Sequence, residues 1–384
     1  MSKKNIIDLK ENSHITVLNT IRINTSISAA DIARSTGYQP STISNNIKIL
    51  KQKNLIVNAV NEIPKSIGKP PTLLTLNHNL GVIIGLECIL NEFRLSVLDF
   101  SGNAIKSSAK KFERILTGDE LLDEIKNFLD PVVKDFINNN MNILGLGLAL
   151  PGLVDNEEGV LIYSKTFKLY KDNFQIKLEE HFNFPVQIEN DANCGALCAI
   201  WFDEKNDVLQ NIIFTTINDV TKGIGTGIII NNKLYKGRNF AGEVLVDLPD
   251  FEQRIESLKQ EIPNYNDFWK DVKCYDCISF TQLVEMAQKN DEIALTFVKE
   301  YGEIVAEEIV KLIGFFDPDN IYLGGEVPSR EFLNQNYILP SIAGTLRKAF
   351  SENYIIPKIS VSKYGIFAVS TGAAALIFRN IFEF

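Results

Sequence analysis

Residues 28–51 contain two short helical patterns separated by a glycine. Ser28 is a good N-cap for the first helix, and Gly37 supplies the turn because positive φ costs glycine little. Pro40 suits the first turn of the second helix, where no N–H donor is needed. The second helix has one apolar face at i, i+4 and i+7, formed by Ile43, Ile47 and Leu50. The stretch therefore predicts a helix-turn-helix.

The opposite face of the second helix is polar. Its short polar and basic side chains suit hydrogen bonds to base edges and phosphates. The candidate DNA-binding residues of this helix and its turn are Gln39, Ser41, Thr42, Ser44, Asn45 and Lys48. The residues predicted to contact bases are Gln39, Ser41, Thr42 and Asn45. Lys48 is expected to contact phosphate. The alternative interpretation is a small surface helical hairpin with a polar outer face.

Residues 55–76 predict a β-hairpin behind the second helix. Residues 55–60 have strand-like composition, and the return strand carries Leu73, Leu74 and Leu76. Between the strands lie Lys65, Gly68, Lys69, Pro70 and Pro71. A cation such as Lys69 in this extended segment suits a narrow minor groove. The hairpin would be the wing of a winged helix, and a plain proline-rich linker is the alternative.

Charge divides the chain into a basic head and an acidic body. Residues 1–75 hold ten Lys and Arg against four Asp and Glu, a net charge of +6. The whole chain carries −9, so residues 76–384 carry −15. This division is typical of a DNA-binding module attached to a ligand-sensing body, because DNA repels the acidic part.

Composition indicates a globular cytoplasmic protein. The 384 residues are 45% apolar, enough for two or three domains with ample core. The sequence shows no membrane span, and residues 1–14 lack the apolar stretch of a signal peptide. The five cysteines, at 88, 194, 198, 274 and 277, do not form the framework of a secreted disulfide protein.

Strand-like and helix-like segments alternate from residue 80 onward. The expected strands are two apolar runs from residue 80 that form a β-hairpin, a further strand after Ser101-Gly102-Asn103, and segments 143–150, 185–189, 211–216, 223–230 and 320–323. The expected helices are 121–138, 190 to about 201, and 280–314. This alternation predicts an α/β body whose sheets are covered by helices.

Five short motifs follow one another along this body. They are PGLVD at 151–155, ENDAN at 189–193, GIGTGIIINNKLYKG at 223–237, AGE at 241–243 and LGG at 323–325. In this order, behind a winged helix, they resemble the ROK family of bacterial repressors and sugar kinases. The resemblance implies a two-lobed actin-like ATPase fold around a cleft.

The resemblance also implies the domain boundaries. The winged helix-turn-helix would occupy residues 1–76 and the ROK body residues 77–384. The first lobe would comprise about 77–190 with the C-terminal helix 366–384, and the second lobe about 191–365.

The same resemblance implies a sugar site. In the family's kinases the residue matching Asp191 takes a proton from the sugar hydroxyl, which suits a carboxylate. Asn190 would bond another hydroxyl, and Glu243 would accept from one or two more. Helix N-capping by Asp191 and Asn193 is the alternative explanation, and both roles can coexist.

Departures from the family argue against phosphoryl transfer. The first phosphate hairpin of the kinases aligns with residues 87–92, where bulky Ile89 and Leu90 would block backbone approach and Glu92 would repel phosphate. The second phosphate loop survives in part, as Gly223, Gly225 and Gly227. We therefore expect neither kinase activity nor a nucleotide cofactor.

The family's zinc site is also incomplete. Val246 stands where the family has a metal-binding histidine, and Cys274 and Cys277 supply half of a zinc site. Ordinary thiols and no metal are expected. Leu245 and Val246 replace a glycine and the histidine that touches the sugar, so the pocket takes a differently substituted sugar or another effector.

These observations together predict a sugar-controlled transcriptional regulator, most simply a repressor of carbohydrate-utilisation genes. Its expected partners are double-stranded operator DNA, a small sugar or sugar derivative and a second copy of the chain, in a homodimer or higher oligomer. A sugar kinase with an appended head and a repressor with a vestigial sugar cleft are the alternatives.

Overall fold

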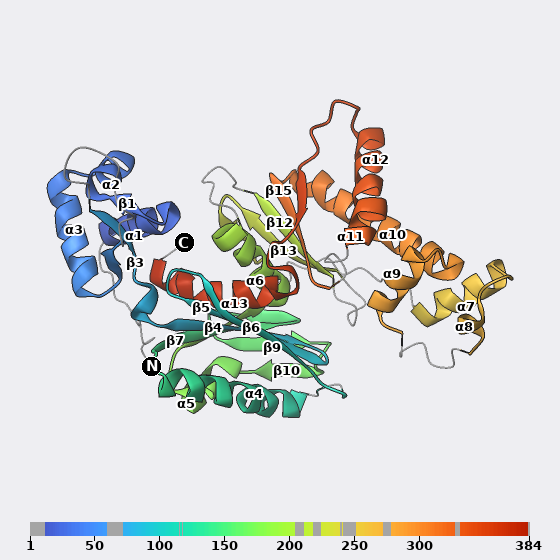
Figure 1. The fold of residues 1–384 in the computed structure, drawn as a ribbon, viewed down its shortest axis with the longest axis horizontal. Coiled ribbons are helices and arrows are strands. Elements are labelled where there is room, and N and C mark those ends of the chain that lie inside the picture. The colour runs from blue at the N-terminus through green and yellow to red at the C-terminus, as the bar shows by residue number, and fades with distance from the viewer. Residues whose placement is uncertain are drawn as a thin grey trace. The chain divides into compact units, whose positions relative to one another are not determined.

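The computed structural model describes residues 12–59, 72–114, 116, 118–203, 211–217, 224–238, 240, 251–271, 278–326 and 331–382. The chain forms two compact units (Figure 1). The first unit comprises residues 1–189 and 373–384, and the second comprises residues 190–372.

The N-terminal part of the first unit is a small domain of three helices and three strands. Its elements are α1 (Asn12–Asn24), β1 (Ile27–Ser28), α2 (Ala29–Thr36), α3 (Pro40–Gln52), β2 (Ile56–Asn58) and β3 (Leu73–Leu76). The strands are antiparallel in the order β1-β3-β2. This is the arrangement of a winged helix, and we call residues 12–76 the head.

The predicted helix signals of the head are confirmed. Ser28 caps α2 by accepting a hydrogen bond from the Asp31 backbone N–H (3.2 Å), and Gly37 ends it with φ of +71°. Pro40 opens α3. The predicted strand 55–60 is shorter, since β2 covers Ile56–Asn58 and residue 60 lies outside the described residues.

The rest of the first unit is built on a five-stranded sheet in the order β11-β7-β4-β5-β6. Its elements are η1 (His78–Leu80), β4 (Val82–Ile89), β5 (Glu92–Asp99), β6 (Ala104–Lys111), α4 (Gly118–Asn138), β7 (Ile143–Leu150), α5 (Phe174–Phe182) and β11 (Val186–Asn190). A second sheet in the order β10-β9-β8 has strands β8 (Leu153–Asp155), β9 (Val160–Ser164) and β10 (Leu169–Asp172).

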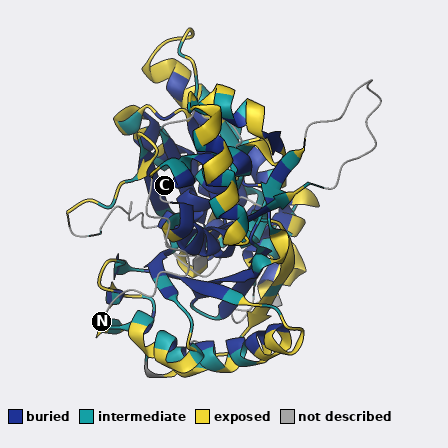
Figure 2. Cartoon of the chain, turned by 90° about the vertical axis from the view of Figure 1, so that its left-hand side faces the viewer, coloured by how far each residue is buried: buried dark blue, intermediate teal, exposed yellow. Residues whose placement is uncertain are grey.

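Both faces of the five-stranded sheet are covered. One face packs Leu86, Phe93 and Leu95 against α4, whose Leu121, Ile125 and Leu129 are fully buried. Figure 1 shows α4 and α5 on this side and the red C-terminal helix α13 (Ala368–Phe382) on the other. Figure 2 shows the central strands as dark blue, buried segments.

The second unit has a five-stranded sheet in the order β14-β13-β12-β15-β16. Its strands are β12 (Ile212–Ile217), β13 (Ile224–Ile230), β14 (Lys233–Leu234), β15 (Asn320–Gly324) and β16 (Lys358–Val361). Its helices are α6 (Asp191–Cys198), η2 (Ala199–Asp203), α7 (Phe251–Glu261), α8 (Asp267–Asp271), α9 (Phe280–Gln288), α10 (Glu292–Phe316), α11 (Glu331–Leu333), η4 (Asn334–Ile338), α12 (Leu339–Ala349) and η5 (Gly365–Phe367).

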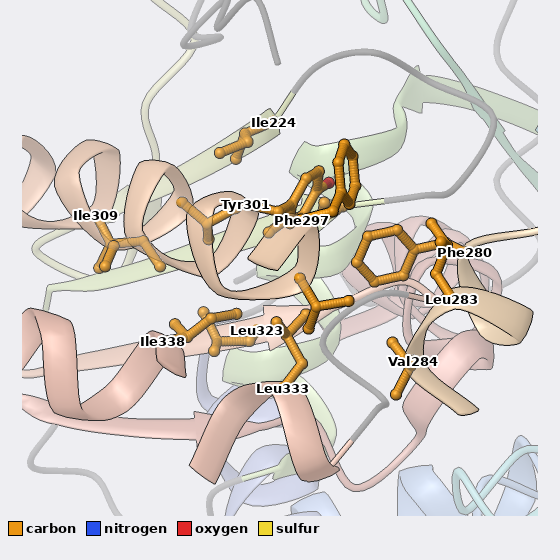
Figure 3. Close-up of a cluster of buried hydrophobic side chains, with 14 of the residues drawn as sticks. Ile224, Phe280, Leu283, Val284, Phe297, Tyr301, Ile309, Leu323, Leu333 and Ile338 are labelled. Carbon is orange, nitrogen blue, oxygen red and sulfur yellow. The ribbon is translucent and has the colours of Figure 1, made fainter. Parts of the chain in front are cut away.

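A large apolar cluster joins α9, α10 and α12 to one face of this sheet (Figure 3). Figure 3 shows Phe280 and Leu283 from α9 beside Phe297 and Tyr301 from α10. The predicted helical region 280–314 is confirmed, and it consists of two helices, because the chain turns at Asn290 (φ +62°) and Asp291 caps a new helix. The core of this unit therefore contains side chains from two successive helices, α9 and α10.

Among the described residues, one helical stretch, Gly365–Phe382, is long and apolar enough to cross a membrane by length and composition, and 72% of it is buried inside the protein.

Candidate DNA interface and effector site

Helix α3 presents the predicted polar face to solvent. Gln39, Ser41, Ser44, Asn45 and Lys48 are exposed, and Thr42 is partly exposed. None of these six side chains makes a hydrogen bond within the described part of the chain. Gln39 precedes the helix without a side-chain cap, so it too is available to a ligand. The structure thus brings six of the seven predicted DNA-binding residues onto one helix and its turn.

The inner face of α3 differs from the prediction at one position. Ile43 and Leu50 are buried as expected, but Asn46 is buried (1% exposed) where Ile47 was predicted, and Ile47 is half-buried. Ser13 in α1 donates a weak hydrogen bond of 3.5 Å to Asn46 Oδ1. A polar contact to α1 therefore stands on the inner face of α3 beside the buried Ile43 and Leu50.

The seventh predicted residue, Lys69, lies outside the described residues, together with Lys65 and Gly68. The two strands that would lead into the wing are present and paired, with Ile56 opposite Leu76. Lys51 on α3 donates to Asn58 Oδ1 (2.6 Å), which ties α3 to the base of the hairpin.

The predicted sugar residues Asn190 and Asp191 lie where β11 ends and α6 begins. Asn190 is the N-cap, and its side-chain oxygen accepts from the Asn193 backbone N–H at 3.0 Å. The capping alternative proposed for Asp191 and Asn193 is therefore corrected, since the capping side chain is Asn190. Asp191 Oδ1 accepts a 2.9 Å hydrogen bond from the Ala192 backbone N–H. The third predicted sugar residue, Glu243, lies outside the described residues.

The Asp191 carboxyl is held in a desolvated position. Burial raises the pKa of Asp191, and hydrogen bonds from the Ala192 and Asp191 backbone and the Asn190 side chain offset this rise only in part. By surface area the Asp191 side chain is partly exposed, so its carboxyl can still accept a hydrogen bond from a hydroxyl ligand.

Gly227 on β13 allows the first turn of α6 to lie against the sheet. A Cβ at this position would come within 2.2 Å of the Ala192 carbonyl oxygen. Close packing therefore accounts for one glycine that sequence reasoning assigned to a partial phosphate loop. Gly223 lies outside the described residues, as do Asn218–Lys222.

The PGLVD and ENDAN motifs have a structural connection that the sequence did not predict. Asn156, directly after PGLVD, donates a 2.7 Å hydrogen bond to Glu189, which is 1% exposed. Asp155 accepts from the backbone N–H groups of Glu157 and Glu158 and shapes the turn. The two motifs thus fix the segment that leads into Asn190.

A buried ionic cluster occupies the first hairpin of the body, formed by β4 and β5. Glu87 on β4 lies opposite Arg94 on β5, with 3.9 Å between Oε2 and Nη1. Glu92 Oε2 lies 3.2 Å from Arg94 Nη2. All three side chains are at most 5% exposed. We call these three residues the ionic cluster.

Sequence reasoning had noted Glu92, Ile89 and Leu90 but missed Arg94. The available signal was an arginine within the otherwise apolar strand FRLSVL, because a buried cation requires an anionic partner. Side chains alternate along a strand, so the cluster lies on the face opposite Cys88 and Phe93. Burial and the Glu87 charge raise the pKa of the Cys88 thiol, which keeps it protonated.

Metal ligands do not gather in the described residues. No group of three or more His, Cys, Asp or Glu side chains there could hold a metal ion. Cys274, Cys277, Leu245 and Val246, on which the zinc argument depended, lie outside the described residues.

Comparison with known proteins separates two kinds of relative. The xylose repressor of Caldicellulosiruptor bescii is 25% identical and covers 98% of both chains. A β-glucoside kinase of Listeria innocua is 27% identical but covers 62% of this chain and 84% of its own. The repressor match therefore includes the head, whereas the kinase match leaves more than a third of this chain unmatched.

The solved structure of a ROK family transcriptional regulator, a homolog of the E. coli MLC protein, has the same fold. Its TM-score is 0.73 at 18% identity, and the match covers 96% of this chain and 97% of that one. The sequence profile described as the ROK family matches residues 83–245 and 268–380. This chain belongs to the ROK family.

Proposed function

We propose that this protein is a DNA-binding transcriptional repressor of carbohydrate-utilisation genes, released from its operator by a sugar. The observation that carries this proposal is the full-length match to a xylose repressor, which includes the head with its unpartnered polar face on α3. Exposed serine, threonine and asparagine groups on a helix after a tight turn suit base edges in a major groove.

The effector is a neutral pentose of the D-xylose type. Asn190 and Asp191 supply amide and carboxylate groups at the start of α6, which match the many hydroxyl donors of a sugar. The relative named for xylose supports the choice of this sugar. Glu243 completes the proposed hydroxyl-binding set.

The protein does not transfer phosphate. The ionic cluster puts two buried carboxylates, both paired with Arg94, in the hairpin that the resemblance aligns with the phosphate hairpin of the kinases. Negative phosphate would meet like charge rather than backbone N–H donors. A coupled ADP-release assay with D-xylose and common aldoses is expected to give no turnover.

A homodimer in the cytoplasm is the form in which we expect the protein to act. Two heads can then occupy two half-sites spaced by whole turns of the DNA helix. The net charge of −15 on residues 76–384 keeps the body away from DNA and leaves contact to the head.

The test of this function begins with a duplex that the protein selects from a random DNA library. Binding of that duplex is measured by fluorescence anisotropy with increasing D-xylose, and thermal stability is measured with sugars, sugar phosphates and ATP. A ligand at about 100 times its Kd stabilises by about 2.7 kcal/mol. DNA release and stabilisation by D-xylose without an ATP effect support the proposal, whereas stabilisation by ATP with turnover contradicts it.

Substituting Asn45 with alanine is expected to weaken binding of the selected duplex by about 1–3 kcal/mol, because a bidentate amide contact to adenine is lost. Affinity for random DNA should stay unchanged. Lys48→Ala is the contrasting variant, since loss of a phosphate contact weakens both duplexes and lowers the salt slope by about 1. Equal losses on both DNAs for Asn45→Ala would show that Asn45 contacts only the backbone.

A further inference from the structure

Helix α13 is shared by the two units. Residues Ala368–Gly372 belong to the second unit, and Ala373–Phe382 belong to the first. The consecutive residues Ala373, Ala374 and Ala375 are all 0% exposed. Successive residues point about 100° apart around a helix, so α13 is enclosed on every side at this point.

The first part of α13 packs directly on α6, the helix that begins with Asp191. A Cβ at Gly372 would lie 1.7 Å from the Cys194 carbonyl oxygen of α6. The two helix backbones are therefore in contact, with no side chain between them. A shift of α6 cannot be absorbed by side-chain rearrangement at this point and is passed to α13.

The next residue is packed just as closely in the first unit. A Cβ at Gly147 on β7 would lie 1.7 Å from the Ala373 carbonyl oxygen. Gly372 and Ala373 are therefore both in backbone contact with a neighbouring element, and neither contact can be relieved by a side-chain rearrangement. Packed interfaces of this kind change between discrete arrangements rather than deforming gradually.

The last turn of α13 ends in an aromatic group. The rings of Phe100 and Phe382 stack with centroids 5.6 Å apart, and Phe378 lies 6.0 Å from Phe382. Phe382 is 0% exposed. The final carbonyl groups of a helix lack partners within it. Here the Phe382 carbonyl accepts a 2.9 Å hydrogen bond from the side-chain amide of Asn19.

Asn19 belongs to α1 of the head, and its amide is held in one orientation. Asn19 Oδ1 accepts from Arg22 Nε at 3.3 Å, which leaves Nδ2 directed to Phe382. On the other side of α1, Val17, Leu18 and Ile21 are 0% exposed in the core of the head. The orientation of α1 therefore sets the orientation of α3.

We propose that Asn19 is a positioning residue that connects the effector site to the DNA-reading helix. A change at Asn190 and Asp191 moves α6, α13 carries the movement, and the Asn19–Phe382 hydrogen bond transfers it to α1. The head and α3 then turn as one body. This inference rests on the proposed function, because it assumes that α6 holds the effector and that α3 contacts DNA.

The test compares Asn19→Ala with Asn24→Ala in the full-length protein. Asn24 is the matched control, because it lies on the same helix and donates to the Thr20 carbonyl of α1 itself. For each variant the Kd for the selected duplex is measured with and without saturating D-xylose. Deuterium uptake at residues 376–382 is measured without sugar or DNA.

For wild type we expect D-xylose to change Kd about 5- to 150-fold. Asn19→Ala is expected to reduce that ratio about 2- to 12-fold, the range of a net hydrogen-bond contribution, and to speed exchange at residues 376–382. Asn24→Ala should change neither quantity. Asn19→Gln keeps the amide donor and is expected to restore part of the ratio.

The remaining outcomes overturn the inference. If Asn19→Ala keeps the wild-type ratio, Asn19 does not position the head for the response, even where exchange becomes faster. If wild type itself shows no response to D-xylose, the proposed effector is wrong. In that case deuterium exchange at residues 376–382 tests the Asn19–Phe382 hydrogen bond by itself. If Asn19→Ala exchanges there at the wild-type rate, this hydrogen bond does not hold α13 to the head.

Discussion

Replacing Arg94 with methionine is expected to lower the free energy of unfolding by about 3–5 kcal/mol, because removing one partner of a buried ion pair leaves charge without compensation. Glu87 and Glu92 would both remain buried, at 1% and 4% exposure. The measurement is urea denaturation at pH 7 followed by far-UV circular dichroism. A chain of two units can unfold in more than one step. The decrease in the free energy of unfolding is therefore calculated from the urea transition whose midpoint the substitution shifts.

The apolar triple variant provides the control for this prediction. Glu87→Leu, Glu92→Leu and Arg94→Met together remove all three charges of the ionic cluster. Replacing a whole buried ionic group with packed apolar residues is often neutral or stabilising, so this variant should recover most of the loss. A triple variant as unstable as Arg94→Met would show that Arg94 acts through packing of its side chain rather than through its charge.

Asp191→Asn is expected to abolish the sugar response while leaving DNA binding intact. The substitution removes the carboxylate acceptor and keeps the shape, so the proposed 5- to 150-fold effect of D-xylose on Kd should fall to about 1. Asp99→Asn is a suitable control, because Asp99 accepts from backbone N–H groups in the turn at Ser101–Asn103. A normal response in Asp191→Asn would remove Asp191 from the effector site.

The same variant should be more stable than wild type at pH 7. Burial raises the pKa of Asp191, so the folded state binds its proton more tightly than the unfolded state. The free energy of unfolding therefore falls as pH rises from the ordinary aspartate pKa through the raised one. Asp191→Asn lacks this dependence, and its advantage should disappear below about pH 4. An asparagine variant less stable than wild type at pH 7 would contradict the desolvated carboxylate.

The sequence predicted elements whose signals are local. Strand β7 was predicted at residues 143–150 and is found there, because eight apolar and small residues lie between clear turn signals. The cap at Ser28 and the turn at Gly37 follow from the chemistry of single residues. Such signals do not depend on what the segment packs against.

Contacts between distant segments could not be predicted in this way. Arg94 and Glu87 face each other only because of strand register, and the helix period alone does not say that Asn46 is buried beside Ser13. Within the predicted helical region 280–314 a second helix begins after Asp291, whose side chain caps it and also accepts from the Trp269 indole N–H (2.9 Å). Each of these three features depends on a contact with a residue that is distant in the sequence.

The ionic cluster also limits how this chain can change over generations. Substituting one of its residues alone would leave a buried charge unmatched, at a cost of about 3–5 kcal/mol against the roughly 5–15 kcal/mol that typically stabilises a domain. A viable path must therefore alter Glu87, Glu92 and Arg94 together or pass through an apolar form of the hairpin.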